Sequence, residues 1–198
     1  MRPWRFLSVL FPVLLLSLAA CGTTNKRIDP DTDDGVGGGG IESGDVRSVG
    51  DQFARDILAW PRLFAGGANP VIYFSELKNT SSAVIDKQIM LEKIETKIVR
   101  NSDGRVRFID RSKEGMEAIM KERTAKREGA VSSSGNKALM GSDYVLKGTI
   151  RSVEKRGKDL KSAYYLITME LTDLESSEKV WKNEYEFKWL GERSAIYQ

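Results

Sequence analysis

Three segments in the last third of the chain alternate apolar and polar residues, and this pattern constrains the fold more strongly than any other feature. Within residues 144–150, 165–171 and 181–189, apolar side chains recur at every second or fourth position. Because the side chains of a β-strand point to opposite faces in turn, each segment should bury one face and expose the other. The connections at 156–162 and 173–179 are short and rich in turn residues, which favours an antiparallel meander of three strands.

The third of these segments carries aromatic rings on one face and charges on the other. The aromatic residues are Trp181, Tyr185, Phe187 and Trp189, and the charged residues are Lys182, Glu184, Glu186 and Lys188. We expect the aromatic face to pack on a core and the charged face to meet solvent. Glu184 and Glu186 could in principle serve a glycosidase as paired carboxylates. Their place among alternating lysines favours solvated cross-strand charges instead.

The first part of the predicted domain has a helical period. Apolar residues recur at steps of four, four and three in the series Val49, Phe53, Ile57 and Trp60. This spacing predicts an amphipathic helix. Ser48 with Asp51 three residues later resembles a capping box, so the helix should begin at Ser48, and Pro61 should end it.

A strand–helix–strand order follows this helix. Residues 71–74 are β-branched or aromatic, which is typical of a buried strand, and residues 78–82 should form a loop. Residues 83–100 carry a wide apolar stripe at helical spacing, and residues 105–109 alternate again. The order predicts a right-handed parallel crossover. Together with the C-terminal meander, it gives an α/β fold in which helices cover a mixed β-sheet.

The region after the crossover is rich in charged residues. Met116, Ile119 and Met120 indicate a third helix, and residues 129–141 should form a mobile loop. The basic residues between 121 and 127 are interleaved with acids, which favours a solvated face. Removing Arg2 and Arg5 with a leader takes Lys plus Arg from 31 to 29, against 28 acidic residues, so the net charge is only +1. A net charge this small does not indicate a nucleic-acid partner.

The N-terminus has the pattern of an exported, lipid-anchored protein. Two arginines precede an apolar run over residues 6–16, which closes on Leu18-Ala19-Ala20-Cys21. The run is about 11 residues long, whereas a membrane-spanning helix needs about 20, so residues 1–20 are predicted to be a signal peptide. The closing residues resemble a lipobox, in which the Cys21 sulfur carries the lipid. An ordinary signal peptide or a buried structural cysteine is the alternative interpretation.

The remaining chain divides into a linker and one domain. Residues 21–47 are acidic and glycine-rich, which predicts a lipidated flexible linker, and residues 48–198 have the size of one globular domain. The run Gly37–Gly40 lacks the Gly-Lys-Ser/Thr of a phosphate loop. Gly22 follows the cysteine where an Asp would resemble an inner-membrane retention signal, so an outer-membrane anchor is favoured. Cys21 is the only cysteine, so no intramolecular disulfide can form.

The sequence contains few candidates for catalytic or metal-binding residues. It contains no histidine, which removes the usual general base and the usual metal ligand. Asp29, Asp31 and Asp33 alternate like calcium ligands, but the later bidentate Glu is missing and the surroundings are linker. We therefore expect no catalytic residue, metal, cofactor or small-molecule substrate. The expected role is binding to a protein partner and, through acylated Cys21, to a lipid bilayer.

Several motifs behind the lipobox carry a family resemblance. They are Pro70-Val71-Ile72-Tyr73-Phe74, Lys78-Asn79-Thr80-Ser81, Arg105 to Asp110, Gly141-Ser142-Asp143-Tyr144-Val145-Leu146-Lys147-Gly148, and Leu171 to Glu175 through Val180-Trp181. In this order they resemble the penicillin-binding-protein activator LpoB family over residues 48 to 190. The resemblance implies an outer-membrane lipoprotein whose domain is similar to the amino-terminal domain of TolB. It also implies binding to a bifunctional penicillin-binding protein, a peptidoglycan synthase, and stimulation of its glycan polymerisation during cell-wall synthesis.

The same motifs leave a second class of function open. The Gly-x-Asp-Tyr-x-Leu-x-Gly strand and the hairpin after it also resemble curli-secretion and TolB-like domains. The alternative is therefore a structural or secretion-pore-associated envelope lipoprotein, which ring formation would favour. The predicted linker is also shorter than the long tethers of the LpoB activators, which leaves the reach of the domain open.

Overall fold

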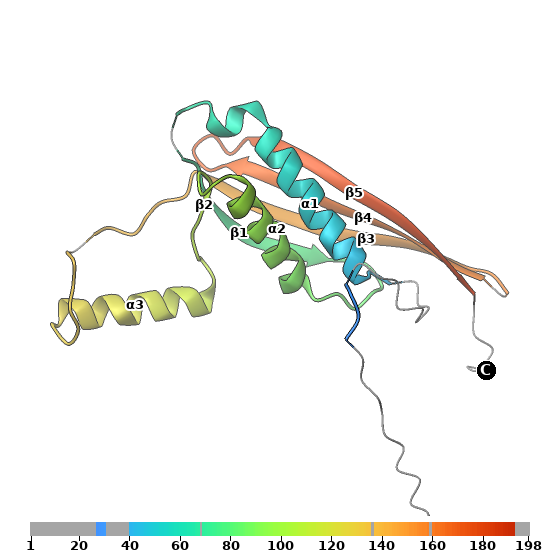
Figure 1. The fold of residues 1–198 in the computed structure, drawn as a ribbon, viewed down its shortest axis with the longest axis horizontal. Coiled ribbons are helices and arrows are strands. Elements are labelled where there is room, and N and C mark those ends of the chain that lie inside the picture. Colours follow the sequence, from blue (N-terminus) through green and yellow to red (C-terminus); the bar gives the residue numbers. More distant parts are fainter. Residues whose placement is uncertain (1–26, 31–39, 68, 136, 159, 193–198) are drawn as a thin grey trace, which may run out of the picture.

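The computed structural model describes residues 27–30, 40–67, 69–135, 137–158 and 160–192. Figure 1 shows these residues as one long twisted sheet with two helices across it and a third helix extending from one end. The predicted signal peptide and Cys21 lie outside the described residues. No described helix is both long enough and apolar enough to cross a membrane.

The sheet is mixed, as the alternation and the crossover predicted. Its five strands are β1 (Val71–Asn79), β2 (Arg107–Phe108), β3 (Tyr144–Arg156), β4 (Leu160–Asp173) and β5 (Lys179–Glu192). They lie in the order β2-β1-β3-β4-β5. β1 pairs in parallel with β2 and β3, and β3, β4 and β5 form an antiparallel meander. The α/β prediction, with its parallel unit and C-terminal meander, is confirmed.

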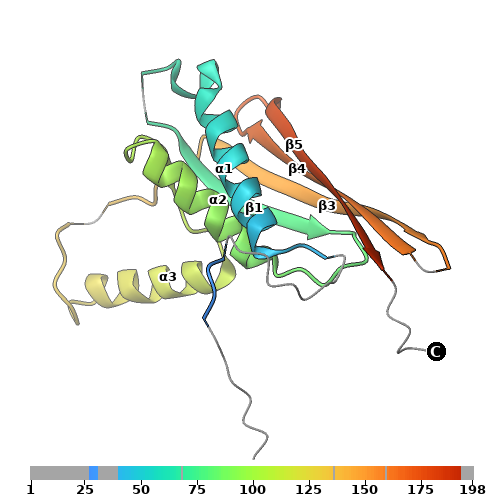
Figure 2. The ribbon, with the colours of Figure 1, turned by 45° about the vertical axis from the view of Figure 1, so that its right-hand side comes forward.

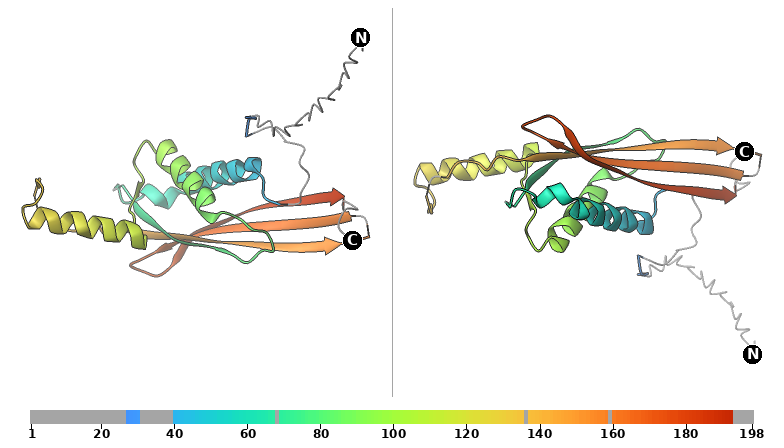
Figure 3. Two further views of the ribbon diagram at one scale, coloured as in Figure 1. Left: turned by 90° about the horizontal axis from the view of Figure 1, so that it is seen from below. Right: turned by 90° about the horizontal axis from the view of Figure 1, so that it is seen from above.

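Two helices cover one face of this sheet. They are α1 (Ser43–Ala59) and α2 (Lys87–Asn101), and a short 3-10 helix, η1 (Pro61–Phe64), follows α1. Both views in Figure 3 place α1 and α2 on the same side of the strands, and no described helix lies across the other side. The third helix, α3 (Lys113–Arg127), extends beyond the end of the sheet (Figure 2) and has no buried residue. The sheet therefore has one covered face and one open face.

The register of the meander explains where the core lies. Leu146 pairs with Leu171, and Ile150 with Ile167, so these four side chains share the covered face and are at most 1% exposed. The helices add Phe53, Ile94 and other apolar residues to the same cluster. The aromatic face of β5 was predicted correctly, although its rings are only half-buried because β5 is an edge strand. Trp181 meets Phe53 edge to face, with 6.3 Å between ring centroids.

The predicted start of the first helix was wrong. Helix α1 begins at Ser43, five residues before Ser48, and Glu42 is its N-cap. The Glu42 N–H donates to the Asp45 carboxylate at 3.0 Å, so the capping box lies at Glu42 and Asp45. The last five residues of the segment assigned to the linker, 43–47, therefore belong to a helix.

Other element boundaries also differ from the prediction. Helix α2 begins at Lys87, because the Asp86 carboxylate accepts from the Gln88 N–H at 2.9 Å and caps the helix there. Val84, which was predicted to lie on its apolar stripe, precedes the helix and is fully exposed. Strand β1 continues to Asn79 into the loop predicted at 78–82, and β2 is only two residues long.

Candidate partner-binding surface

The open face of the sheet is the candidate functional surface. It consists of the side chains that point away from α1 and α2, and its centre includes Lys147, Thr149, Arg151, Leu166, Thr168 and Glu170. These residues line a shallow groove of about 540 Å³, to which β1 and β5 also contribute. Long paired strands hold the surface, so its side chains are displayed on a rigid backbone.

Glu170 lies at the centre of the charges on this face. Its carboxylate is 3.2 Å from the Lys147 Nζ, directly across the β3–β4 pair, and 3.0 Å from the Lys179 Nζ of β5. Burial opposes ionisation of Glu170, but the hydrogen bonds from Lys179 and Lys147 outweigh it and hold the pKa of the carboxyl below its ordinary value. Glu170 is therefore ionised at neutral pH and links three strands.

The groove carries more positive than negative charge. Its lining includes five cations, Lys78, Lys147, Arg151, Lys179 and Lys182, and three carboxylates, Glu76, Glu170 and Glu184. The difference, 5 − 3, is +2. Such a face is complementary to an acidic patch on a partner, and complementary charge raises association rates.

The carboxylates considered for a glycosidase form no catalytic pair. The Tyr164 hydroxyl donates to the Glu186 carboxylate at 2.7 Å, and this hydrogen bond raises the pKa of the tyrosine. The Glu184 backbone carbonyl accepts a hydrogen bond from Gln52 of α1. Glu186 is instead a hydrogen-bond acceptor on a solvated strand face.

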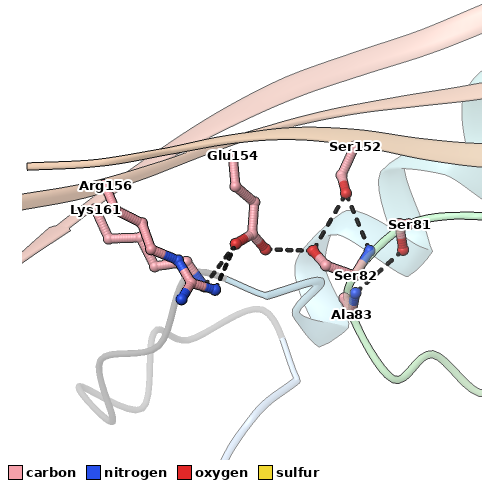
Figure 4. Close-up of polar contacts among 7 residues, drawn as sticks. All are labelled: Ser81, Ser82, Ala83, Ser152, Glu154, Arg156 and Lys161. Atoms are coloured by element: carbon pink, nitrogen blue, oxygen red, sulfur yellow. Dashed lines mark hydrogen bonds and ion pairs between the residues drawn. The ribbon is translucent and has the colours of Figure 1, made fainter.

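A second polar cluster lies at the far end of the β3–β4 hairpin (Figure 4). The Ser82 hydroxyl donates to one Glu154 oxygen and lies 3.3 Å from the Ser152 hydroxyl. The other Glu154 oxygen lies 3.2 Å from the Arg156 guanidinium and 3.5 Å from the Lys161 ammonium. The Ser82 hydroxyl, with these cations, lowers the pKa of Glu154. A carboxylate stabilised in this way is a weak base, so the cluster ties the 80–83 loop to β3 and does not activate Ser82 as a nucleophile.

The motifs that carry the family resemblance build the fold around the open face. The Asp143 carboxylate accepts from the Val71 N–H at 2.8 Å and so fixes the start of β3 beside β1. Gly148 leaves room for Met169, and a Cβ there would lie 2.7 Å from the Thr168 carbonyl oxygen. Asp173 accepts from the N–H groups of Glu175 and Ser176 and closes the β4–β5 turn.

The predicted lipid-attachment residue lies outside the described part of the chain. The structure also has a surface, the open face, that the sequence analysis missed. Cys21 lies outside the described residues, as do Asp31 and Asp33, while Asp29 is described and exposed. Among the described residues, no group of three or more His, Cys, Asp or Glu side chains is placed to hold a metal ion. The open face was missed because its charges were interpreted only as solvated. The alternating Lys147, Thr149 and Arg151 were its available signal.

A family model supports the resemblance in the motifs. The model described as peptidoglycan-synthase activator LpoB matches residues 45–187. Among curated proteins, none matches the chain.

Solved structures that match the chain include domains of the same description. The LpoB C-terminal domain from Salmonella enterica is 14% identical, with a TM-score of 0.42, and the match covers 72% of this chain and 98% of that domain. The corresponding Escherichia coli domain is 11% identical, with a TM-score of 0.44 and the same coverage. An NMR structure of E. coli LpoB is 12% identical, with a TM-score of 0.39, and the match covers 97% of this chain and 91% of that one.

Proposed function

The chain belongs to the peptidoglycan-synthase activator LpoB family, and from this premise we propose that it binds a bifunctional penicillin-binding protein and activates its glycan polymerisation. The observation that carries the proposal is the family match over residues 45–187, which spans the folded region from α1 to β5. In this role the chain is a regulator of cell-wall synthesis and catalyses no reaction itself. The alternative, a structural component of an envelope assembly, has no observation of its own in its favour.

The open face is the docking surface in this proposal. It is rigid, it is not covered by a described helix, and its groove carries an excess of two positive charges. The synthase should therefore present an acidic, largely flat surface to β3, β4 and β5. Binding there leaves α1 and α2 on their own side of the sheet, so the core need not rearrange on binding.

The second part of the proposal is an outer-membrane anchor at Cys21, and the fold limits its reach. The Ser43 hydroxyl donates to the Pro30 carbonyl at 2.7 Å, so residue 30 is held at the start of α1. Only residues 22–29 then separate the domain from Cys21, and 8 residues span at most about 29 Å. If that exposed hydrogen bond opens, residues 22–42 span at most about 75 Å. The docking module of the synthase should therefore extend towards the outer membrane.

The anchor is tested by replacing its attachment atom. We expect Cys21→Ala to move the protein from the membrane fraction to the soluble fraction, because the acyl chains are its only durable attachment to a bilayer in this proposal. The measurement is fractionation of cells that express each form. Unchanged membrane retention of the variant would contradict the acyl anchor.

Activation is tested with the chain from Gly22 to Gln198, which contains every described residue. We expect it to raise the glycan-polymerising rate of its cognate bifunctional synthase in detergent, where the tether has no influence. Arg151→Glu with Lys182→Glu reverses two exposed charges on the open face and should abolish most of the stimulation. Arg55→Glu with Lys87→Glu makes the same change of charge on the exposed sides of α1 and α2 and should leave it intact.

Two results would reject parts of the proposal separately. No binding and no stimulation with any bifunctional synthase of the organism would reject the activator function and leave the envelope-assembly alternative. Equal loss of stimulation in both charge-reversed variants would keep the activator function but reject the open face as its docking surface.

A further inference from the structure

The α3 arm, which we define as α3 with the returning segment 128–143, stands apart from the sheet. None of the residues of α3 is buried, and Figures 1 and 2 show the helix beyond the end of the strands. Two arginines, one on α3 and one just before it, hold the returning segment in place. Arg111 donates to the Met140 carbonyl and Arg123 to the Lys137 carbonyl, each at 2.6 Å. The arm is thus held together by its own hydrogen bonds and contributes little to the core.

A basic pocket lies between the second half of α3 and the returning segment. Its volume is about 410 Å³, and the residues that line it include Arg123, Lys126, Arg127, Lys137, Ser133 and Ser134. Four of the lining side chains are cationic and none is a carboxylate. Like charges at this spacing repel one another, so a bound anion would stabilise the arm.

An ion pair and the helix dipole account for only some of the cations in this pocket. Lys126 forms an ion pair with Glu122 at 3.3 Å, and cations in the last turn of a helix interact favourably with its dipole. Lys137 lies on the returning segment, where the dipole gives it no such role. Among the described residues, the side chains of Arg127 and Lys137 have no hydrogen bond or ion pair. The Arg123 Nε is buried and has no hydrogen-bond partner there either.

We propose that this basic pocket is a binding site for a phosphate group. Guanidinium groups form paired hydrogen bonds with phosphate oxygens, and serine hydroxyls supply further donors. The pocket combines two arginines, two lysines and two serines. A phospholipid headgroup and free phosphate share this chemistry. Exposed apolar side chains on the same arm, Met120, Leu139 and Met140, would lie beside the acyl region if the phosphate belongs to a lipid.

The site is independent of the synthase and can be tested without it. The first probe is inorganic phosphate, with binding measured by calorimetry. The second is vesicles of phosphatidylcholine with about 30% phosphatidylglycerol, an anionic lipid that gives the surface a negative potential, with binding measured by sedimentation. Vesicles of phosphatidylcholine with oleate at the same charge density separate phosphate recognition from general attraction to negative charge. The protein is again the chain from Gly22 to Gln198.

Two matched double variants locate the site. Arg127→Gln with Lys137→Gln removes two pocket cations without removing the backbone carbonyl that Arg123 holds. This change should weaken phosphate binding by roughly 30-fold, as expected for two charges close to an anionic group. Lys113→Gln with Lys121→Gln removes two cations from the same helix outside the pocket and should weaken binding by less than about fivefold.

The outcomes show whether the phosphate is free or belongs to a lipid, and which results would reject the proposal. Binding of inorganic phosphate that the pocket variant loses assigns free phosphate as a ligand. Binding of phosphatidylglycerol vesicles alone, also lost in the pocket variant, assigns a lipid headgroup. Equal binding to oleate vesicles, equal losses in both double variants, or no binding to any phosphate probe would overturn the proposal.

Discussion

The two faces of the sheet use the same strands for different purposes. On the covered face, Leu146, Ile150, Ile167 and Leu171 are closed off by α1 and α2 and are at most 1% exposed. At positions adjacent to these residues, Lys147, Arg151 and Glu170 line the open groove. The apolar side chains on the covered face thus stabilise the fold, and the side chains on the other face form a charged surface. Substitutions at neighbouring positions should therefore separate folding from binding.

The largest expected effect is in the covered core. Ile94 of α2 is 0% exposed, so Ile94→Ala removes buried methyl groups and leaves a cavity. The free energy of unfolding should fall by about 2–5 kcal/mol, measured by urea denaturation. Val153→Ala is the matched change on the open side, where the side chain is 59% exposed, and should stay within about 0.5 kcal/mol. Similar losses at both sites would mean that the faces are not distinct.

A smaller loss of stability is expected at Gly148, where atoms of the neighbouring strand pack closely against the backbone. Gly148→Ala would bring a Cβ against Met169 and the Thr168 carbonyl, so the free energy of unfolding should fall by about 1–3 kcal/mol. Gly191 of β5 has nothing within 4 Å of a built Cβ. Gly191→Ala should therefore leave stability unchanged or raise it by less than about 1 kcal/mol. Thermal denaturation of both variants measures the difference, and equal stability would contradict the close packing at Gly148.

The sequence predicted those parts of the fold in which one local pattern determines the structure. Alternation over three segments gave the meander, because a strand that buries one face must alternate. Element ends were predicted less well, since two cap candidates lie close together. Asp45 follows Glu42 at the same spacing at which Asp51 follows Ser48, and the structure uses the first pair. Asp86 was a usable signal for the start of α2 that the spacing of Val84 obscured.

The functional surface was harder to predict than the fold. Charges on a strand face look the same in the sequence whether they meet solvent or a partner. Lys147 and Glu170 are 23 positions apart, and Lys179 is a further nine along, so their ion pairs depend on the register of three strands. The parallel pairing of β1 with β3 was not predicted either, because it connects strands separated by all of α2, β2 and α3.

The smallest stability effect is expected on the open face. Because the Glu170 pKa is lower in the folded state than its ordinary value of 4.5, its contribution is complete above pH 4.5 and is lost as the pH falls through the folded pKa. Glu170→Gln should cost less than about 1 kcal/mol at pH 7 and should flatten the acid limb of the stability–pH curve. Glu175→Gln, at an exposed residue with no ion pair among the described residues, is the matched control. An identical acid limb in all three proteins would contradict the role of Glu170.

The central claim, that a peptidoglycan synthase docks on the open face, is tested most directly by crosslinking in intact cells. A photo-crosslinking residue replaces Arg151 or Lys182 on the open face, or Arg55 on the exposed side of α1 as the matched control. All three positions are exposed, so each variant should fold and the label should be accessible. We expect the bifunctional penicillin-binding protein to be captured from Arg151 and Lys182 but not from Arg55. Capture from Arg55 alone, or capture of other envelope proteins from all three positions, would contradict the claim.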